Sequence, residues 1–110
     1  MAPIGLDIET SYSLLSNARR RRLLALLGEA RVWTVDALAR EIAAREDDAT
    51  VDRIELTLVH NHLPRLADYD VIEWDGRSGD VVRSDRYADL EPLLRTTADG
   101  EAVSAETPSN

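Results

Sequence analysis

Residues 58–83 read LVHNHLPRLADYDVIEWDGRSGDVVR, and this stretch decides the fold. Its first part carries apolar side chains at helical spacing: Leu58, Leu63, Leu66 and Ala67. Two short alternating runs follow at 71–74 and 80–83, separated by the turn-rich segment 75–79. A period of 3.6 that changes to a period of 2 across a loop with glycine predicts a helix leading directly into a β-hairpin.

Helices are also predicted on both sides of this stretch, from capping residues and helical periodicity. The helix that enters the hairpin begins after the cap Thr50 and ends near Tyr69, with Asp70 in a left-handed conformation. Three other helices are predicted: residues 17–27 between the cap Ser16 and the stop Gly28, a helix after the cap Thr34, and residues 87–94.

Shorter features complete the prediction. Thr10 or Ser11 caps a short turn, Val32 and Trp33 are extended, and Pro64 removes a backbone donor and kinks the long helix near His60. The pattern predicts a mainly α chain with a small β-hairpin, a winged helix-turn-helix. Residues 1–9 are then an N-terminal arm, 10–95 the winged helix-turn-helix domain, and 96–110 a disordered acidic tail.

Composition excludes several function classes. The chain has 110 residues, no Cys and two His, so disulfides and thiolate ligands are excluded, and we expect neither a metal nor a cofactor. It contains no phosphate-binding glycine loop and no recognisable catalytic motif, and an enzyme is not expected. No apolar run is long enough to span a membrane, and a cytoplasmic protein is expected.

The charge is strongly acidic. Thirteen basic residues, all of them Arg, face 21 acidic ones, which gives a net charge of -8. Such a charge ordinarily repels DNA. An acidic composition without Lys is, however, similar to that of proteins from salt-loving archaea. At molar salt the Debye length falls to about 3 Å, so this repulsion loses its range.

Three segments carry a family resemblance: LLSNARRRRLLALL, WTVDALAREIAARE and LVHNHLPRLADYDVIEWDGRSGDVV. Together they resemble a family of small haloarchaeal winged-helix domains of unassigned function, similar in turn to dimeric arsenic-repressor-type winged helix-turn-helix regulators. The resemblance covers about residues 11–95, and Asp70 stands where a Gly is usual. It implies a transcriptional regulator that binds double-stranded DNA, and it supplies no catalytic or ligand residues.

Candidate DNA-binding residues lie on three parts of the chain. Thr57, His60, Asn61 and Arg65 recur at spacings of three or four, so they can share a face of the long helix, whose first turn also carries Arg53. Arg77 lies at the predicted wing tip. Arg20 and Arg21 belong to the run 19–22, which wraps around its helix. Each group also has an interpretation without DNA contact. The helix face is then solvated, with His62 partly buried, and Arg77 has no role. At least half of the run 19–22 then makes structural pairs within the protein.

One cluster opposes DNA binding. Residues 46–55 hold five carboxylates and only Arg53, at the start of the predicted recognition helix. The alternative function is therefore a winged-helix protein–protein interaction module, in which this acidic face meets a basic protein partner or the other subunit. A continuous positive strip joining the first helix, the recognition helix and Arg77 favours DNA, whereas an unbroken acidic face favours the protein partner.

The apolar residues at both ends of the chain predict a homodimer. They are Ile4, Leu6, Ile8, Tyr12 and Leu14 near the start, and Tyr87, Leu90, Leu93 and Leu94 near the end. Three helices and a hairpin cannot obviously bury both sets, so a second copy of the chain is expected to cover them.

Overall fold

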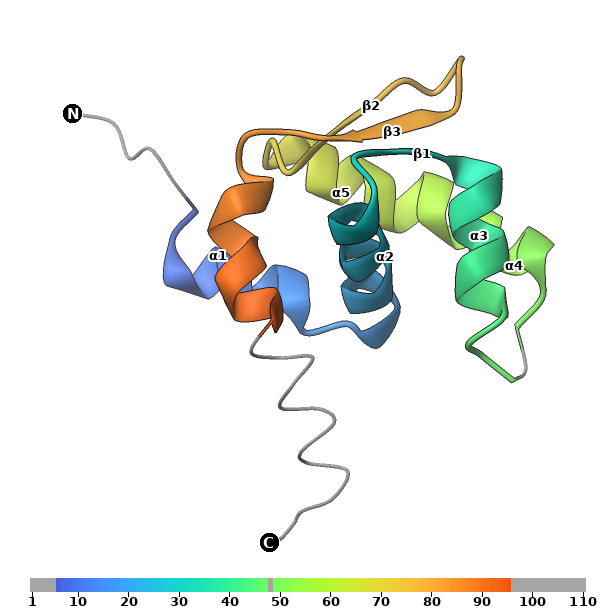
Figure 1. The fold of residues 1–110 in the computed structure, drawn as a ribbon, viewed down its shortest axis with the longest axis horizontal. Coiled ribbons are helices and arrows are strands. Elements are labelled where there is room, and N and C mark those ends of the chain that lie inside the picture. Colours follow the sequence, from blue (N-terminus) through green and yellow to red (C-terminus); the bar gives the residue numbers. More distant parts are fainter. Residues whose placement is uncertain (1–5, 48, 96–110) are drawn as a thin grey trace, which may run out of the picture.

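The computed structural model describes residues 6–47 and 49–95. The structure is rich in helices and has a small sheet (Figure 1). Its elements, in chain order, are α1 Ile8–Leu15, α2 Ala18–Glu29, β1 Val32–Thr34, α3 Val35–Ala43, α4 Val51–Thr57, the π-helical turn η1 Leu58–His62, α5 Leu63–Asp68, β2 Ile72–Trp74 and β3 Asp80–Arg83. A further helix covers residues 87–95. The predicted helices and hairpin are therefore present, whereas the predicted tail 96–110 lies outside the described residues.

The sheet contains one strand more than the predicted hairpin. β2 and β3 pair antiparallel, and β1 pairs with the other edge of β3, which gives the order β1-β3-β2. The extended segment at Val32 and Trp33 becomes β1 because Trp33 lies opposite Val81 and the Val35 amide donates to the Gly79 carbonyl at 3.0 Å. This pairing ties the hairpin to the start of α3.

Two of the predicted helix starts are confirmed. The Thr34 hydroxyl accepts from the Ala37 amide at 3.0 Å, and the Thr50 hydroxyl accepts from the Arg53 amide at 3.2 Å. Each interaction satisfies one of the free amides at a helix start.

The starts of the first two helices differ from the prediction. α1 is capped by Asp7, whose carboxylate accepts from the Thr10 amide, and not by Thr10 or Ser11. α2 is capped by Asn17, since Ser16 has helical backbone angles and its hydroxyl donates to the Ser13 carbonyl. Both errors are of one or a few residues and arise because several adjacent residues can act as caps.

The end of α2 also differs. Gly28 was predicted to stop this helix, but α2 continues to Glu29. Gly28 is required by tertiary packing, because a Cβ there would lie 2.8 Å from the Tyr87 hydroxyl, which donates to the Leu24 carbonyl.

The junction between α5 and β2 is confirmed. Asp70 has a φ of 61°. The Asp70 amide donates to the Ala67 carbonyl, and the Val71 amide to the Leu66 carbonyl, both at 3.0 Å. This pair of bonds is a Schellman motif, which closes the helix and turns the chain into β2.

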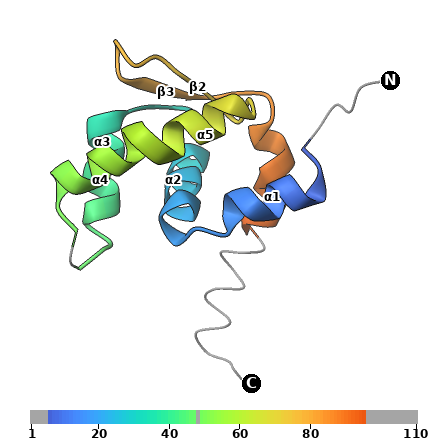
Figure 2. The same ribbon diagram turned by 180° about the vertical axis from the view of Figure 1, so that it is seen from behind.

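One apolar core lies among the helices and under the sheet. Its fully buried side chains come from every helix and from the hairpin, and the largest of them include Leu14, Leu23, Leu38, Ile42, Leu58, Leu66, Ile72 and Leu90. Seen from behind, α4, η1 and α5 form one continuous rod that crosses α2 and α3, with the hairpin along one edge (Figure 2). None of the helices in the described part of the chain is long and apolar enough to cross a membrane.

Candidate nucleic-acid interface

The α4–η1–α5 rod is a single helix that widens for one turn. In η1 the Leu63 amide donates to the Leu58 carbonyl, five residues back, which is the π-helical pattern. Pro64 follows directly; it has no amide to donate to the His60 carbonyl, and its ring would crowd that carbonyl in a regular α-helix. The predicted disturbance near His60 is thus present, as a π turn.

The outward side of the rod is divided by Leu56, which is 59% exposed. On one flank, Arg53 and Thr57 line a depression shared with α2, and Thr57 and Asn61 line its continuation. On the other flank, His60 lines a separate depression with Leu56 and acidic neighbours. The shared face of Thr57, His60, Asn61 and Arg65 stays a prediction: Thr57 and Asn61 line one depression, and His60 lines another.

Two other residues predicted to contact DNA, Arg65 and Arg77, are exposed. Arg65 lies on α5 and Arg77 lies in the turn between β2 and β3. The Asp75 carboxylate accepts from the Arg77 amide at 2.9 Å, which fixes the turn and leaves the Arg77 side chain in solvent. The hairpin that carries Arg77 projects beyond the body of helices (Figure 1).

Arg20 is not available to DNA. It is only 7% exposed, and its guanidinium donates to the carbonyls of Ser13 and Leu14 and to Nδ1 of His62. The assignment of Arg20 as a DNA contact is corrected on this ground: it holds the end of α1 against the rod. Arg21, assigned with it, is half-buried and donates to the Leu15 carbonyl at 2.6 Å.

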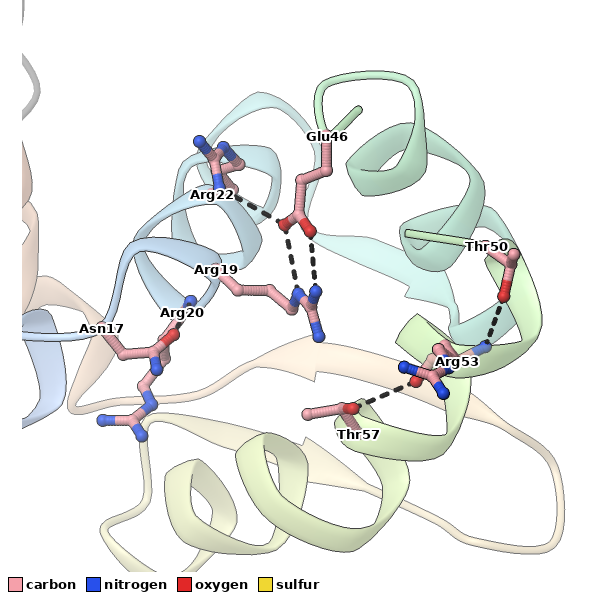
Figure 3. Close-up of polar contacts among 8 residues, drawn as sticks. All are labelled: Asn17, Arg19, Arg20, Arg22, Glu46, Thr50, Arg53 and Thr57. Atoms are coloured by element: carbon pink, nitrogen blue, oxygen red, sulfur yellow. Dashed lines mark hydrogen bonds and ion pairs between the residues drawn. The ribbon is translucent and has the colours of Figure 1, made fainter. Parts of the chain in front are cut away.

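The other two members of the run pair with the acidic connection. Nε and Nη2 of Arg19 donate to the two carboxylate oxygens of Glu46 at 3.1 and 2.7 Å, and Arg22 lies 3.3 Å from the same carboxylate (Figure 3). The hydrogen bond from Arg19 lowers the pKa of Glu46, which therefore stays ionised. Structural pairing for at least half of the run is confirmed.

His62 is the second buried polar residue in this region. It is 2% exposed, which is deeper burial than the partly buried His62 of the sequence analysis, and its Nδ1 accepts from Nε of Arg20 at 3.3 Å. Burial and the neighbouring Arg20 lower the pKa of His62 to about 4, so the ring is neutral at pH 7. Desolvation by the same burial lowers the pKa of Arg20.

A groove runs between the start of α2 and the rod. Its wider part has a volume of about 780 Å³ and is lined by four arginines, Arg19, Arg22, Arg45 and Arg53, together with Glu46 and Asp47. A narrower part of about 350 Å³ continues past Thr57 to Asn61 and the start of α2. We call the two parts together the arginine groove.

The carboxylates of the acidic cluster 46–55 lie on different sides of the rod. Glu46 lies in the arginine groove and is paired with Arg19 and Arg22. Asp52 and Glu55 line the depression on the opposite flank. The negative charge that the sequence gathers at the start of the rod is therefore not spread evenly around it.

Sequence reasoning assigned none of Arg19, Arg22 and Arg45 to a binding site. A signal existed for one pair, since Arg19 and Arg22 are three residues apart and share a helix face. Their meeting with Arg45 and Arg53 depends on how α2 packs against the rod, which no local pattern shows. Among residues 6–47 and 49–95, no group of three His, Asp or Glu side chains is placed to hold a metal ion.

One protein family matches the chain. The match covers residues 12–82, which is more than half of the sequence, and the family is described as a domain of unknown function, DUF7344. The chain belongs to the DUF7344 family. The DUF7344 match includes the rod and most of the hairpin, and ends before the helix over 87–95. No curated protein and no solved structure matches the chain, so the similarity to arsenic-repressor-type regulators stays a prediction.

Proposed function

We propose that this DUF7344 chain is a winged helix-turn-helix protein that binds double-stranded DNA and regulates transcription. In this proposal α3 and the rod form the helix-turn-helix, the rod enters the major groove, and the β2–β3 hairpin is the wing. The observation that carries it is the placement of the rod, which lies across one face of the molecule with Arg53, Asn61 and Arg65 exposed and runs straight into a projecting hairpin.

The chemistry of the exposed residues supports this assignment. The Asn61 amide can donate to and accept from adenine, and the exposed Leu56 can contact a thymine methyl group. Arg77 on the wing and Arg65 on α5 suit phosphates or a narrow minor groove.

The acidic cluster is a weaker objection in three dimensions than in sequence. Glu46, the first carboxylate of the cluster, is neutralised by two guanidinium groups at the side of the rod that faces α2. The flank of the rod with Arg53 and Thr57 therefore combines hydrogen-bonding groups with nearby positive charge. We propose this flank as the one that faces a phosphate backbone.

The test is a fluorescence-anisotropy assay with duplexes from the upstream region of the protein's own gene, in KCl from 0.2 M to molar. Asn61→Ala should relax preference at one base pair by about 1–3 kcal/mol. Arg77→Ala should weaken binding to all duplexes alike. Arg95→Ala is the control, because Arg95 pairs with Glu91 on the helix over 87–95 and lies outside the rod and the wing.

Two results would reject the proposal. One is equal affinity of the parent and both variants for every duplex. The other is no binding of any duplex together with association of a basic protein partner, which would favour the protein–protein interaction module.

We also propose that the protein is a homodimer, with a smaller contact surface than the sequence predicted. Leu14, Tyr87, Leu90 and Leu94 were expected to need a second chain, but they are buried within one chain. Ile4 lies outside the described residues. The remaining apolar surface on α1 comprises Ile8 and Tyr12, 57% and 60% exposed and one helical turn apart. Such a pair supports a two-fold contact between α1 helices.

A further inference from the structure

We propose that the arginine groove binds a phosphate-class oxyanion, supplied either by a duplex backbone or by a free phosphorylated molecule. The site adjoins the base-reading residue Asn61 of the rod, and it depends on the proposed DNA-binding function only where the phosphate belongs to a duplex. Its binding residues are Arg19 and Arg53, with Arg22 beside them.

The charge of the groove is the first argument. Four guanidinium groups and two carboxylates from the described residues line its wider part. Arg45 also pairs with Glu41 at 3.1 Å, which leaves a surplus of one positive charge in a chain whose net charge is -8. Only two apolar side chains, Ala49 and Leu56, line that part. A groove that is open, polar and locally positive suits a small anion and not an apolar ligand.

The second argument is that Arg19 is held in place. Glu46 accepts two parallel hydrogen bonds from Nε and Nη2 of Arg19, which fixes the plane of the guanidinium. Nη1 of Arg19 has no hydrogen-bond partner among the described residues, and Figure 3 shows the third nitrogen directed away from Glu46, toward the side of α4 that carries Thr57. Because the side chain is already ordered, binding an anion costs little further entropy.

The third argument comes from the opposite wall. The Arg53 guanidinium forms no hydrogen bond or ion pair with any residue in 6–47 or 49–95. Its backbone, by contrast, is fixed: the amide donates to Thr50 and the carbonyl accepts from Thr57 (Figure 3). The fixed backbone holds the Arg53 guanidinium at the groove, where no carboxylate of the described residues pairs with it. A phosphate between Arg19 and Arg53 would accept from Nη1 of Arg19 and from the guanidinium of Arg53.

The test is a titration with inorganic phosphate followed by NMR of the arginine Nε–Hε resonances, at constant ionic strength with KCl as the balancing salt. The expected result is a saturable shift of the Arg19 and Arg53 resonances and no shift of Arg95. Arg53→Gln should raise the dissociation constant for phosphate roughly five- to tenfold. Arg95→Gln makes the same change in net charge away from the groove and should leave the constant within about twofold.

Folding of each variant is checked by its backbone amide spectrum, which should match that of the parent outside the groove. Shifts that are equal for all arginines, linear in phosphate, or unchanged by Arg53→Gln would overturn the proposal, since they indicate screening only.

A short duplex distinguishes the two sources of phosphate. If the duplex displaces inorganic phosphate from Arg53, the backbone is the ligand; if phosphate binds and the duplex does not compete, the ligand is a free phosphorylated molecule. Phosphate binding without any DNA binding would leave the groove assignment in place and reject the proposed function. DNA binding without saturable phosphate binding would leave the proposed function in place and reject the groove assignment.

Discussion

At the scale of single residues, two buried contacts hold elements that are far apart in sequence. Arg20 joins the end of α1 to His62 on the rod. Tyr87, from the last helix, donates to the Leu24 carbonyl of α2 and fills the space above Gly28. In the sequence Arg20 resembles a surface residue and Gly28 a helix stop, yet Arg20 is buried and Tyr87 leaves no room for a Cβ at position 28.

The Arg20–His62 contact predicts a pH-dependent stability. The pKa of His62 is about 4 in the fold, below its ordinary 6.5, so the unfolded chain takes up this proton first. The contribution of His62 to stability is therefore complete above pH 6.5 and is lost as the pH falls to 4, a change of up to about 3 kcal/mol in the free energy of unfolding.

Denaturant unfolding of the parent and of His62→Gln at fixed KCl, between pH 4 and 7, measures this effect. The variant should show a shallower loss of stability with falling pH, because its side chain accepts from Arg20 without titrating. His60→Gln, on the exposed flank of the same turn, is the control and should keep the slope of the parent. Parallel curves for all three proteins would contradict the prediction.

The Gly28–Tyr87 contact predicts a non-additive pair of substitutions. Gly28→Ala normally stabilises a helix, but here the new Cβ would lie 2.8 Å from the Tyr87 hydroxyl, so we expect a loss of about 1–2 kcal/mol. Tyr87→Phe alone should cost about 1 kcal/mol through the lost bond to Leu24. In the Tyr87→Phe background, Gly28→Ala should become neutral or stabilising, as thermal unfolding would show; equal effects in both backgrounds would exclude the clash.

At the scale of elements, the rod combines two helical segments whose inward faces are set independently. Ile54 and Leu58 point into the core before the π turn, and Leu63 and Leu66 do so after it. A π turn is in effect one residue inserted into an α-helix, so it lets both segments keep their buried faces. His60 and Asn61 line depressions on different flanks of the rod, because successive helical residues point in different directions.

This geometry predicts that one residue of the turn is dispensable for folding. Deleting His60 together with Pro64→Ala should convert the rod into a regular α-helix with both apolar faces still inward, and should keep cooperative unfolding and the far-ultraviolet circular dichroism of the parent. Deleting Ala25, an exposed residue of the regular helix α2, should unfold the protein because no spare residue exists there. Loss of folding in the first variant would show that the turn is structurally required.

At the scale of the whole molecule, packing of α2 against the rod redistributes charge. Arg19 and Arg22 reach across to Glu46, so an acidic chain presents a locally positive groove beside its exposed helix. On α1, Ile8 and Tyr12 remain exposed as an apolar pair.

The apolar pair predicts the assembly state. In molar KCl at tens of micromolar, sedimentation should return a species of about twice the 12.2 kDa chain. Tyr12→Glu should convert it to a monomer, because the charge would be buried at the two-fold contact, whereas Glu9→Gln on the same helix should not. A parent that sediments only as a single chain would reject the dimer.

Local sequence determined the elements of this protein. Helical periodicity, the caps Thr34 and Thr50, the left-handed Asp70 and the alternating runs of the hairpin act within a few residues, so they are legible in the chain itself. The tertiary structure alone decided what depends on distant partners: the third strand β1, the burial of Arg20, the need for glycine at position 28 and the arginine groove. Their physical causes are desolvation, steric contact and ion pairing between elements that are far apart in the sequence. The hydrogen bond from Tyr87 to Leu24, for example, joins residues 63 positions apart. No local sequence pattern encodes such contacts.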